Sequence, residues 1–189
     1  MTFDQIIRER YSCKCFDPNR QISNEQLNAI LEAGRVAPTA KNLQEHHIYV
    51  VQSEEMLKKI DTASPCRYGA PTCLVVAFDA ENVYTYPNST RDSGIEDATI
   101  VATHLLLAAT ANGVNSCWIN CLDPAKMAEV ICLPANEMIL MMLDLGFAGV
   151  LDLFLVKRQL DRIVAVFLFR SYLGNYARTC FNYSNRNHL

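Results

Sequence analysis

The sequence predicts helices and strands interspersed around one sheet, a fold of the α/β or α+β class. Apolar residues recur with helical spacing in several segments, and short, strongly apolar runs typical of strands lie between them. Turn residues separate the two kinds of segment. The 189 residues are 50% hydrophobic and 20% charged, so one domain of this length can bury a full core.

The chain is expected to begin with two helices. The first covers residues 3–10, where the apolar side chains fall on one face. The second begins at Ser23, a good N-cap, and Gln26 completes a capping box three residues later. Pro38 ends this helix, because proline cannot continue the helical hydrogen-bond pattern.

Two strands with a helix between them are expected next. Residues 46–52 form a strand, residues 53–63 form a short helix, and residues 70–80 form a second strand. The second strand is apolar throughout its length, which is typical of a strand that is buried on both faces.

The longest helix is expected at residues 94–114. It is apolar nearly all round, which predicts a core helix, and Asn112 and Gly113 form its C-terminal stop. Residues 115–122 then form a strand.

The last clear elements are a helix at 123–134 and a strand at 138–149. Asp123 is the N-cap of this helix and Pro124 occupies its first position. Beyond Gly149 the apolar spacing mixes helical and strand periods. There is no internal repeat, linker or low-complexity stretch in the chain.

The composition of the chain argues against two classes of protein, those that bind nucleic acids generally and those that span a membrane. A net charge of −3 argues against general nucleic-acid binding, and no apolar run approaches the ~20 residues needed to span a membrane. The charged N-terminus does not resemble a signal peptide, so we expect a cytoplasmic protein with reduced thiols. The eight cysteines, none in a C-x-x-C pair, are Cys13, Cys15, Cys66, Cys73, Cys117, Cys121, Cys132 and Cys180.

No familiar motif for a nucleophile, a metal protease or a phosphate-binding loop occurs, which suggests that a cofactor carries the chemistry. The basic stretch RERYSCKCF could hold its phosphate. If this segment is extended, Arg10, Ser12 and Lys14 point to one side, and Cys13 and Cys15 point to the other. The alternative interpretation is a solvated basic loop.

Two further polar clusters could contribute. Residues 37–44 lie at a helix-to-strand junction, and the pair Lys157–Arg158 follows an apolar stretch. Spacing alone favours a plain connecting loop for residues 37–44, and a solvent-facing pair is the alternative for Lys157–Arg158. The hydrogen-bonding side chains of the first cluster are Thr39, Asn42 and Gln44.

Taken in order, these motifs resemble the nitroreductase family of FMN-dependent oxidoreductases. Residues 10–16 (RYSCKCF) are similar to the family's opening arginine-serine-basic pattern, and residues 37–44 (APTAKNLQ) to its A-P-S-A-x-N-x-Q motif. Residues 69–76 and 94–120 resemble its core strand, core helix and following strand. The late motif is matched by Lys157–Asp161, and the resemblance runs from about residue 5 to residue 164.

The resemblance implies an α+β fold built as a three-layer α/β/α sandwich around a central mixed sheet, with FMN at a homodimer interface. It implies one domain at 1–166, followed by an extension at 167–189 that either crosses onto the partner subunit or is disordered. No nucleic-acid or membrane partner is expected.

The implied activity is ping-pong reduction of nitroaromatic, quinone or similar acceptors by NAD(P)H, with the flavin in place of catalytic side chains. Three alternatives remain. They are a specialised flavoenzyme of the same fold, such as a reductive dehalogenase, a flavin-binding protein without turnover, and a cysteine-rich metal or thiol-redox protein.

The resemblance also assigns residues. Arg10 and Ser12 would serve the FMN phosphate and ribityl side, and Lys14 the pyrimidine edge, while Cys13 and Cys15 would only pack. Pro38, Thr39, Ala40 and Asn42 would reach FMN from the partner subunit. No metal ligand is expected, and the full implied cofactor set is Arg10, Tyr11, Ser12, Lys14, Pro38, Thr39, Ala40, Asn42, Gln44, Ser116, Cys117, Trp118, Ile119, Lys157 and Arg158.

The sequence departs from the family pattern at three places, one of which is the tail Phe167–Leu189, which has no counterpart in the family. Glu45 and His46 replace a proline–tryptophan pair, so a charge is expected where relatives have apolar packing at the interface. The connection at 147–156 is short and hydrophobic, where relatives have a longer polar loop that shapes the substrate pocket.

Overall fold

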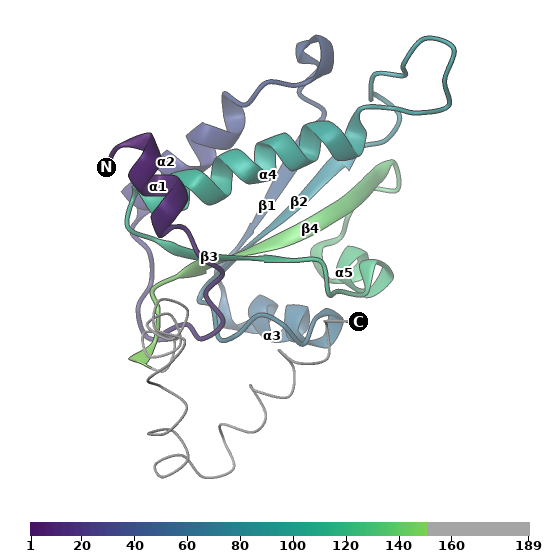
Figure 1. Cartoon of the computed structure of the whole chain (residues 1–189). Helices are drawn as coiled ribbons and strands as arrows, with labels where there is room; N and C mark the ends of the chain where they lie inside the picture. Colours follow the sequence, from purple (N-terminus) through teal and green to yellow (C-terminus); the bar gives the residue numbers. More distant parts are fainter. Residues whose placement is uncertain (151–189) are drawn as a thin grey trace, which may run out of the picture. The chain divides into compact units, whose positions relative to one another are not determined.

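The computed structural model describes residues 1–150 of the chain. The predicted pair Lys157–Arg158 and the predicted domain boundary after residue 166 lie outside the described residues. A four-stranded sheet in the order β1-β2-β4-β3 forms the centre of the fold (Figure 1). The strands are β1 (His46–Val51), β2 (Thr72–Asp79), β3 (Asn115–Ile119) and β4 (Glu137–Gly146).

Helices cover both faces of this sheet (Figure 1). Helices α2 and α4 pack on one face, and α3 and α5 pack on the other. The α+β class and the three-layer α/β/α arrangement expected from the sequence are therefore confirmed. The helices are α1 (Phe3–Glu9), α2 (Asn24–Arg35), the 3-10 turn η1 (Ala40–Asn42), α3 (Glu54–Ala63), α4 (Gly94–Ala111) and α5 (Pro124–Ile131).

The sheet has less parallel strand pairing than the expected mixed sheet. All three pairs of neighbouring strands, β1–β2, β2–β4 and β4–β3, run antiparallel. In the described residues a parallel pairing occurs only as an isolated bridge between Ser12 and Ser116, at the outer edge of β3.

Alternating residues of the central strands divide the core into two layers. Leu74 and Leu143 face α2 and α4, whereas Val75 and Met142 face α3 and α5. Seven of the eight residues of β2 are buried, as its continuous apolar pattern predicts. Helix α4 contributes buried residues to the first layer from Ala98 to Ala109.

Local signals place the helix ends where the sequence predicted them. The Ser23 hydroxyl accepts the Gln26 N–H, and the Gln26 side chain accepts the Ser23 N–H, which completes the capping box of α2. The Asp123 carboxylate caps α5. No helix of residues 1–150 is both long enough and apolar enough to traverse a bilayer.

Candidate functional site

The basic stretch after α1 runs along the outer edge of β3. Ser12 forms the parallel bridge to Ser116, and the Cys13 N–H donates to the Ser116 carbonyl oxygen at 3.0 Å. The Asn115 side-chain amide donates to the Tyr11 hydroxyl at 3.2 Å. Two groups of predicted cofactor residues, one at 10–14 and one on β3, therefore lie together within one protomer.

A second set of main-chain hydrogen bonds fixes the end of this stretch. The Gly149 N–H donates to the Cys15 carbonyl oxygen at 2.8 Å, and the Asp17 N–H donates to the Phe147 carbonyl oxygen at 2.9 Å. Phe16 is buried between these bonds. The extended backbone that the alternation argument required is thus held from two sides.

The side chains of this stretch alternate as the sequence suggested. Cys13 is fully buried in the core layer under α3 and α5, whereas Ser12 and Lys14 are exposed. Arg10 is half-buried, and its guanidinium has no ion-pair partner within residues 1–150. A guanidinium beside an exposed hydroxyl and an ammonium group is a suitable donor set for a phosphate.

The residues of β3 divide between the two faces of the sheet. Cys117 and Ile119 lie in the core layer with α3 and α5, so only their main-chain groups could face a cofactor. Ser116 and Trp118 have the other orientation, toward the layer with α4. The Ser116 hydroxyl is buried without a hydrogen-bond partner among the described residues, so it retains capacity for one.

The loop after α2 has an unusual backbone. Lys41, Asn42 and Gln44 have φ values of 52°, 55° and 54°, in the left-handed region that side chains disfavour. The loop keeps this shape because the Ala40 N–H donates to Asp97 Oδ1 at 2.9 Å and the Gln44 N–H donates to the Thr39 hydroxyl at 3.0 Å. Pro38, Asn42 and Gln44 are exposed, and Thr39 and Ala40 are half-buried.

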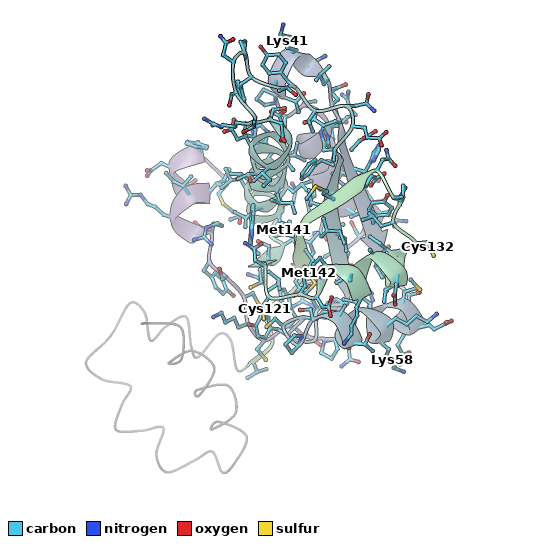
Figure 2. All side chains as sticks on the ribbon, turned by 90° about the vertical axis from the view of Figure 1, so that its right-hand side faces the viewer. Lys41, Lys58, Cys121, Cys132, Met141 and Met142 are labelled. Atoms are coloured by element: carbon cyan, nitrogen blue, oxygen red, sulfur yellow. The ribbon has the colours of Figure 1, made fainter. Side chains whose placement is uncertain are left out.

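The structure does not bring this loop to the basic stretch within one protomer. Asp97, which holds the loop, is in the first turn of α4, whereas Asn112 at the other end of α4 leads into β3. Fifteen helical steps separate the two residues, which corresponds to about 22 Å. Figure 2 shows Lys41 at one extreme of the described part.

A buried carboxyl pair lies behind the loop, and sequence reasoning missed it. Glu45 and Asp97 are only 5% and 4% exposed, and neither Glu45 carboxyl oxygen has a hydrogen-bond partner among the described residues. Burial and, to a smaller extent, the neighbouring Asp97 raise the pKa of Glu45 to about 7. Burial also lowers the pKa of the adjacent His46.

Glu45 is therefore not the surface charge that the sequence suggested. With a pKa of about 7, its carboxyl carries a proton in about half of the molecules at neutral pH, and a protonated Glu45 can donate to Asp97 Oδ2. The only sequence signal was the glutamate at a position where relatives have proline, which gives no indication of burial.

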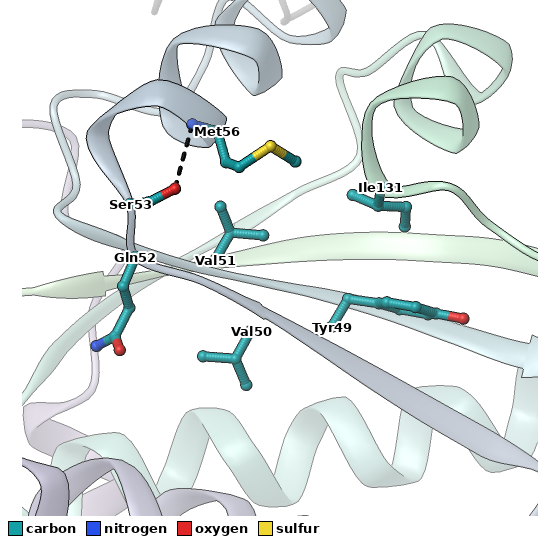
Figure 3. A pocket seen from close by; sticks show the side chains of 7 residues that line it. All are labelled: Tyr49, Val50, Val51, Gln52, Ser53, Met56 and Ile131. Atoms are coloured by element: carbon teal, nitrogen blue, oxygen red, sulfur yellow. Dashed lines mark hydrogen bonds between the residues drawn. The ribbon is translucent and has the colours of Figure 1, made fainter.

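An open cavity of about 340 Å³ lies elsewhere, at the β1 edge of the sheet (Figure 3). It is bounded by the end of β1, the start of α3 and the end of α5. None of the predicted cofactor residues lines it. Its lining residues are Tyr49, Val50, Val51, Gln52, Ser53, Met56 and Ile131.

Residues 1–150 contain no group of three or more His, Cys, Asp and Glu side chains that could hold a metal ion. Along the outer edge of β3, Arg10, Ser12 and Lys14 offer a guanidinium, a hydroxyl and an ammonium group, a donor set that suits the phosphate of an organic cofactor.

Comparison with known proteins assigns the family. The sequence model of the nitroreductase family matches residues 7–66 and 61–147. This match covers well over half of the chain, which therefore belongs to the nitroreductase family.

Individual relatives agree with this assignment. An Archaeoglobus fulgidus protein, provisionally named an NADH dehydrogenase/NAD(P)H nitroreductase, is 30% identical over 150 residues, which cover 76% of this chain and 83% of the relative. A crystal structure of a nitroreductase family protein from Clostridium difficile superposes with a TM-score of 0.78 at 29% identity, covering 92% of this chain and 99% of that one.

A second solved structure shares the fold. It is a nitroreductase from Exiguobacterium sibiricum in complex with FMN, with a TM-score of 0.71 at 20% identity, and the match covers 78% of this chain and 89% of that one.

Proposed function

We propose that this chain is an FMN-dependent oxidoreductase that uses NAD(P)H to reduce nitroaromatic, quinone or similar acceptors. One observation supports the proposal above the others. The bridge between Ser12 and Ser116 gathers Arg10, Ser12, Lys14 and the β3 edge into one surface. Family membership and the names of the relatives support the cofactor and the reductant.

Each part of this surface has a distinct task. Arg10 and Ser12 bind the phosphate and ribityl side of FMN, and Lys14 supplies positive charge at the pyrimidine edge. The buried Ser116 hydroxyl offers one further hydrogen bond toward the ring. Bound FMN accepts a hydride from NAD(P)H in one half-reaction and passes two electrons to the acceptor in the other.

Removing the Arg10 side chain tests the cofactor assignment. A charge-assisted hydrogen bond to phosphate is worth roughly 1.5–3 kcal/mol, so Arg10→Ala should weaken FMN binding about tenfold to a hundredfold. Titration of the apoprotein with FMN, followed by quenching of flavin fluorescence, measures the change.

Arg8→Ala is the matched control. Arg8 lies in the last turn of α1, two residues before Arg10, but it is exposed and forms an ion pair with Asp4. FMN affinity should be unchanged in this variant. Equal losses in both variants would mean that general charge, rather than a phosphate contact, governs binding, and a wild-type protein that takes up no FMN would contradict the function itself.

The full site is proposed to form across a homodimer of the 1–166 domain. The loop at 38–44 and the basic stretch lie at opposite ends of α4, which favours a site made by the loop of one subunit and the stretch of the other. A two-fold interface would give two equivalent sites. The extension at 167–189 is proposed to cross onto the partner.

Mixed dimers test this assembly. Asn42→Gly suits the experiment because glycine tolerates the left-handed φ of 55° at this position, whereas alanine adds strain. An Arg10→Ala subunit paired with an Asn42→Gly subunit should recover one intact site and leave one doubly damaged site. Titration should show half-stoichiometric FMN binding with wild-type affinity.

The parent homodimers are the reference for this measurement. They should contain only weakened sites, so any wild-type affinity must come from the mixed species. If the mixture binds FMN no better than the average of its parents, each site lies within a single subunit.

A further inference from the structure

The end of α3 is tied to the segment that follows β3. The Ser64 hydroxyl donates to the Cys121 carbonyl oxygen at 2.7 Å and accepts the Cys66 N–H at 3.2 Å. The Asp123 N–H donates to the Ala63 carbonyl oxygen at 2.8 Å. Because one buried hydroxyl contacts both cysteine backbones, Cys66 and Cys121 lie side by side although 55 residues separate them in the sequence.

Their thiols are also neighbours. Both cysteines are free, and burial and, to a smaller extent, the nearby Cys121 thiol raise the pKa of the Cys66 thiol. Cys66 is 4% exposed, whereas Cys121 is exposed. A buried and an exposed thiol, on backbones that contact the same Ser64 hydroxyl, are candidates for a disulfide, which requires such a close approach of the two backbones.

We propose that Cys66 and Cys121 form a reversible disulfide when the protein meets a peroxide. Cys121 reacts first, because it is the exposed thiol: its thiolate attacks one oxygen of hydrogen peroxide, the O–O bond breaks, and a sulfenic acid forms as hydroxide leaves. Cys66 then attacks the Cys121 sulfur, the S–S bond forms, and the sulfenic oxygen leaves as water.

The electrons and atoms balance. Two thiols lose two electrons and two hydrogens in total, one hydrogen peroxide is reduced, and two water molecules form. A small dithiol reverses the change by exchange. Burial raises the pKa of the Cys66 thiol, which suits it to the second step rather than the first.

The other cysteines are less suited to this reaction. Cys73 and Cys117 both pair across the sheet with Asp144, so the whole of β4 separates them. Cys132 is exposed at the end of α5 (Figure 2). The inference concerns a site that is independent of the proposed FMN chemistry, because the pair needs only its own geometry and a peroxide.

Peptide mapping of the full chain tests the proposal. Reduced protein is treated with hydrogen peroxide, remaining thiols are alkylated in denaturant, and the protein is digested with trypsin. The expected product joins the tryptic peptide 60–67, which contains Cys66, to the peptide 92–126. Fragment ions should assign the link to Cys121 rather than Cys117, and dithiothreitol should release it.

Two variants sharpen the result. Cys121→Ser should abolish the cross-link, whereas Cys132→Ser, which removes the other exposed thiol of residues 1–150, should leave it unchanged. Oxidised wild type should also unfold at a higher temperature than reduced wild type, because the link restricts the unfolded chain. Oxidation of Cys121 to sulfinic acid without a cross-link, or a link between other cysteines, would overturn the proposal.

Discussion

Replacing Gly94 with alanine is expected to destabilise the protein by about 3 kcal/mol, the upper end for overpacking a core. A Cβ atom at this position would lie 2.3 Å from Cε2 and 2.6 Å from Cδ2 of Phe78, far inside the contact distance. Phe78 is 4% exposed in the layer beneath α4, so its ring cannot simply turn outward. Denaturant unfolding followed by circular dichroism measures the loss.

A second variant distinguishes this clash from a general effect on the helix. Phe78→Leu reduces the side chain that the new methyl would meet. The double variant should then lose clearly less stability than the sum of the two single changes, since neighbouring residues are not additive. Additive losses would show that the Phe78 contact does not limit the position of Gly94.

Gly94→Ala should also disturb the proposed FMN loop. The close contact with Phe78 sets the depth at which α4 packs on β2, and Asp97 lies in the first turn of this helix. A displaced helix would weaken the hydrogen bond from Ala40 N–H to Asp97 Oδ1. Faster amide exchange at Ala40 in the variant would report this change.

Replacing Glu45 with glutamine is expected to stabilise the protein above pH 7 by about 3 kcal/mol. Burial holds the pKa of Glu45 near 7, compared with 4.5 for an unperturbed glutamate. The folded state therefore keeps a proton that the unfolded state releases. Wild type loses stability as the pH rises from about 4.5 to about 7, whereas glutamine stays neutral and can still donate to Asp97.

The difference in unfolding free energy between Glu45→Gln and wild type should change with pH. It should be small below pH 4.5, grow between pH 4.5 and 7, and become constant above pH 7. Glu129→Gln, which removes an exposed carboxyl from α5, is the control and should match wild type throughout. A constant difference at every pH would mean that Glu45 does not hold its proton in the folded state.

Much of the fold could be predicted because local chemistry determines it. The capping box at Ser23 and Gln26, the proline at position 124 and the apolar run of β2 are each visible within a few residues of sequence. The alternation that buries Cys13 and exposes Ser12 is local as well. In each case the signal lies inside the element that it predicts.

Features that depend on distant partners could not be predicted in this way. The strand order, the near absence of parallel pairing and the contact between Cys66 and Cys121 depend on how separate segments meet. The same holds for Glu45, which is buried beside Asp97 from the distant helix α4. Resemblance supplied the grouping of the basic stretch with β3, which spacing alone had left open.

The attachment of the basic stretch to β3 has a consequence for biosynthesis. Tyr11 is synthesised early, but its hydrogen-bond partner Asn115 follows it by 104 residues. The partner of Asp17 is Phe147, and the partner of Cys15 is Gly149. Loop closure over such spans is slow compared with local helix formation. On the ribosome, the contacts of the basic stretch with β3 and with residues 147–149 can therefore form only after nearly all of the described domain has been made.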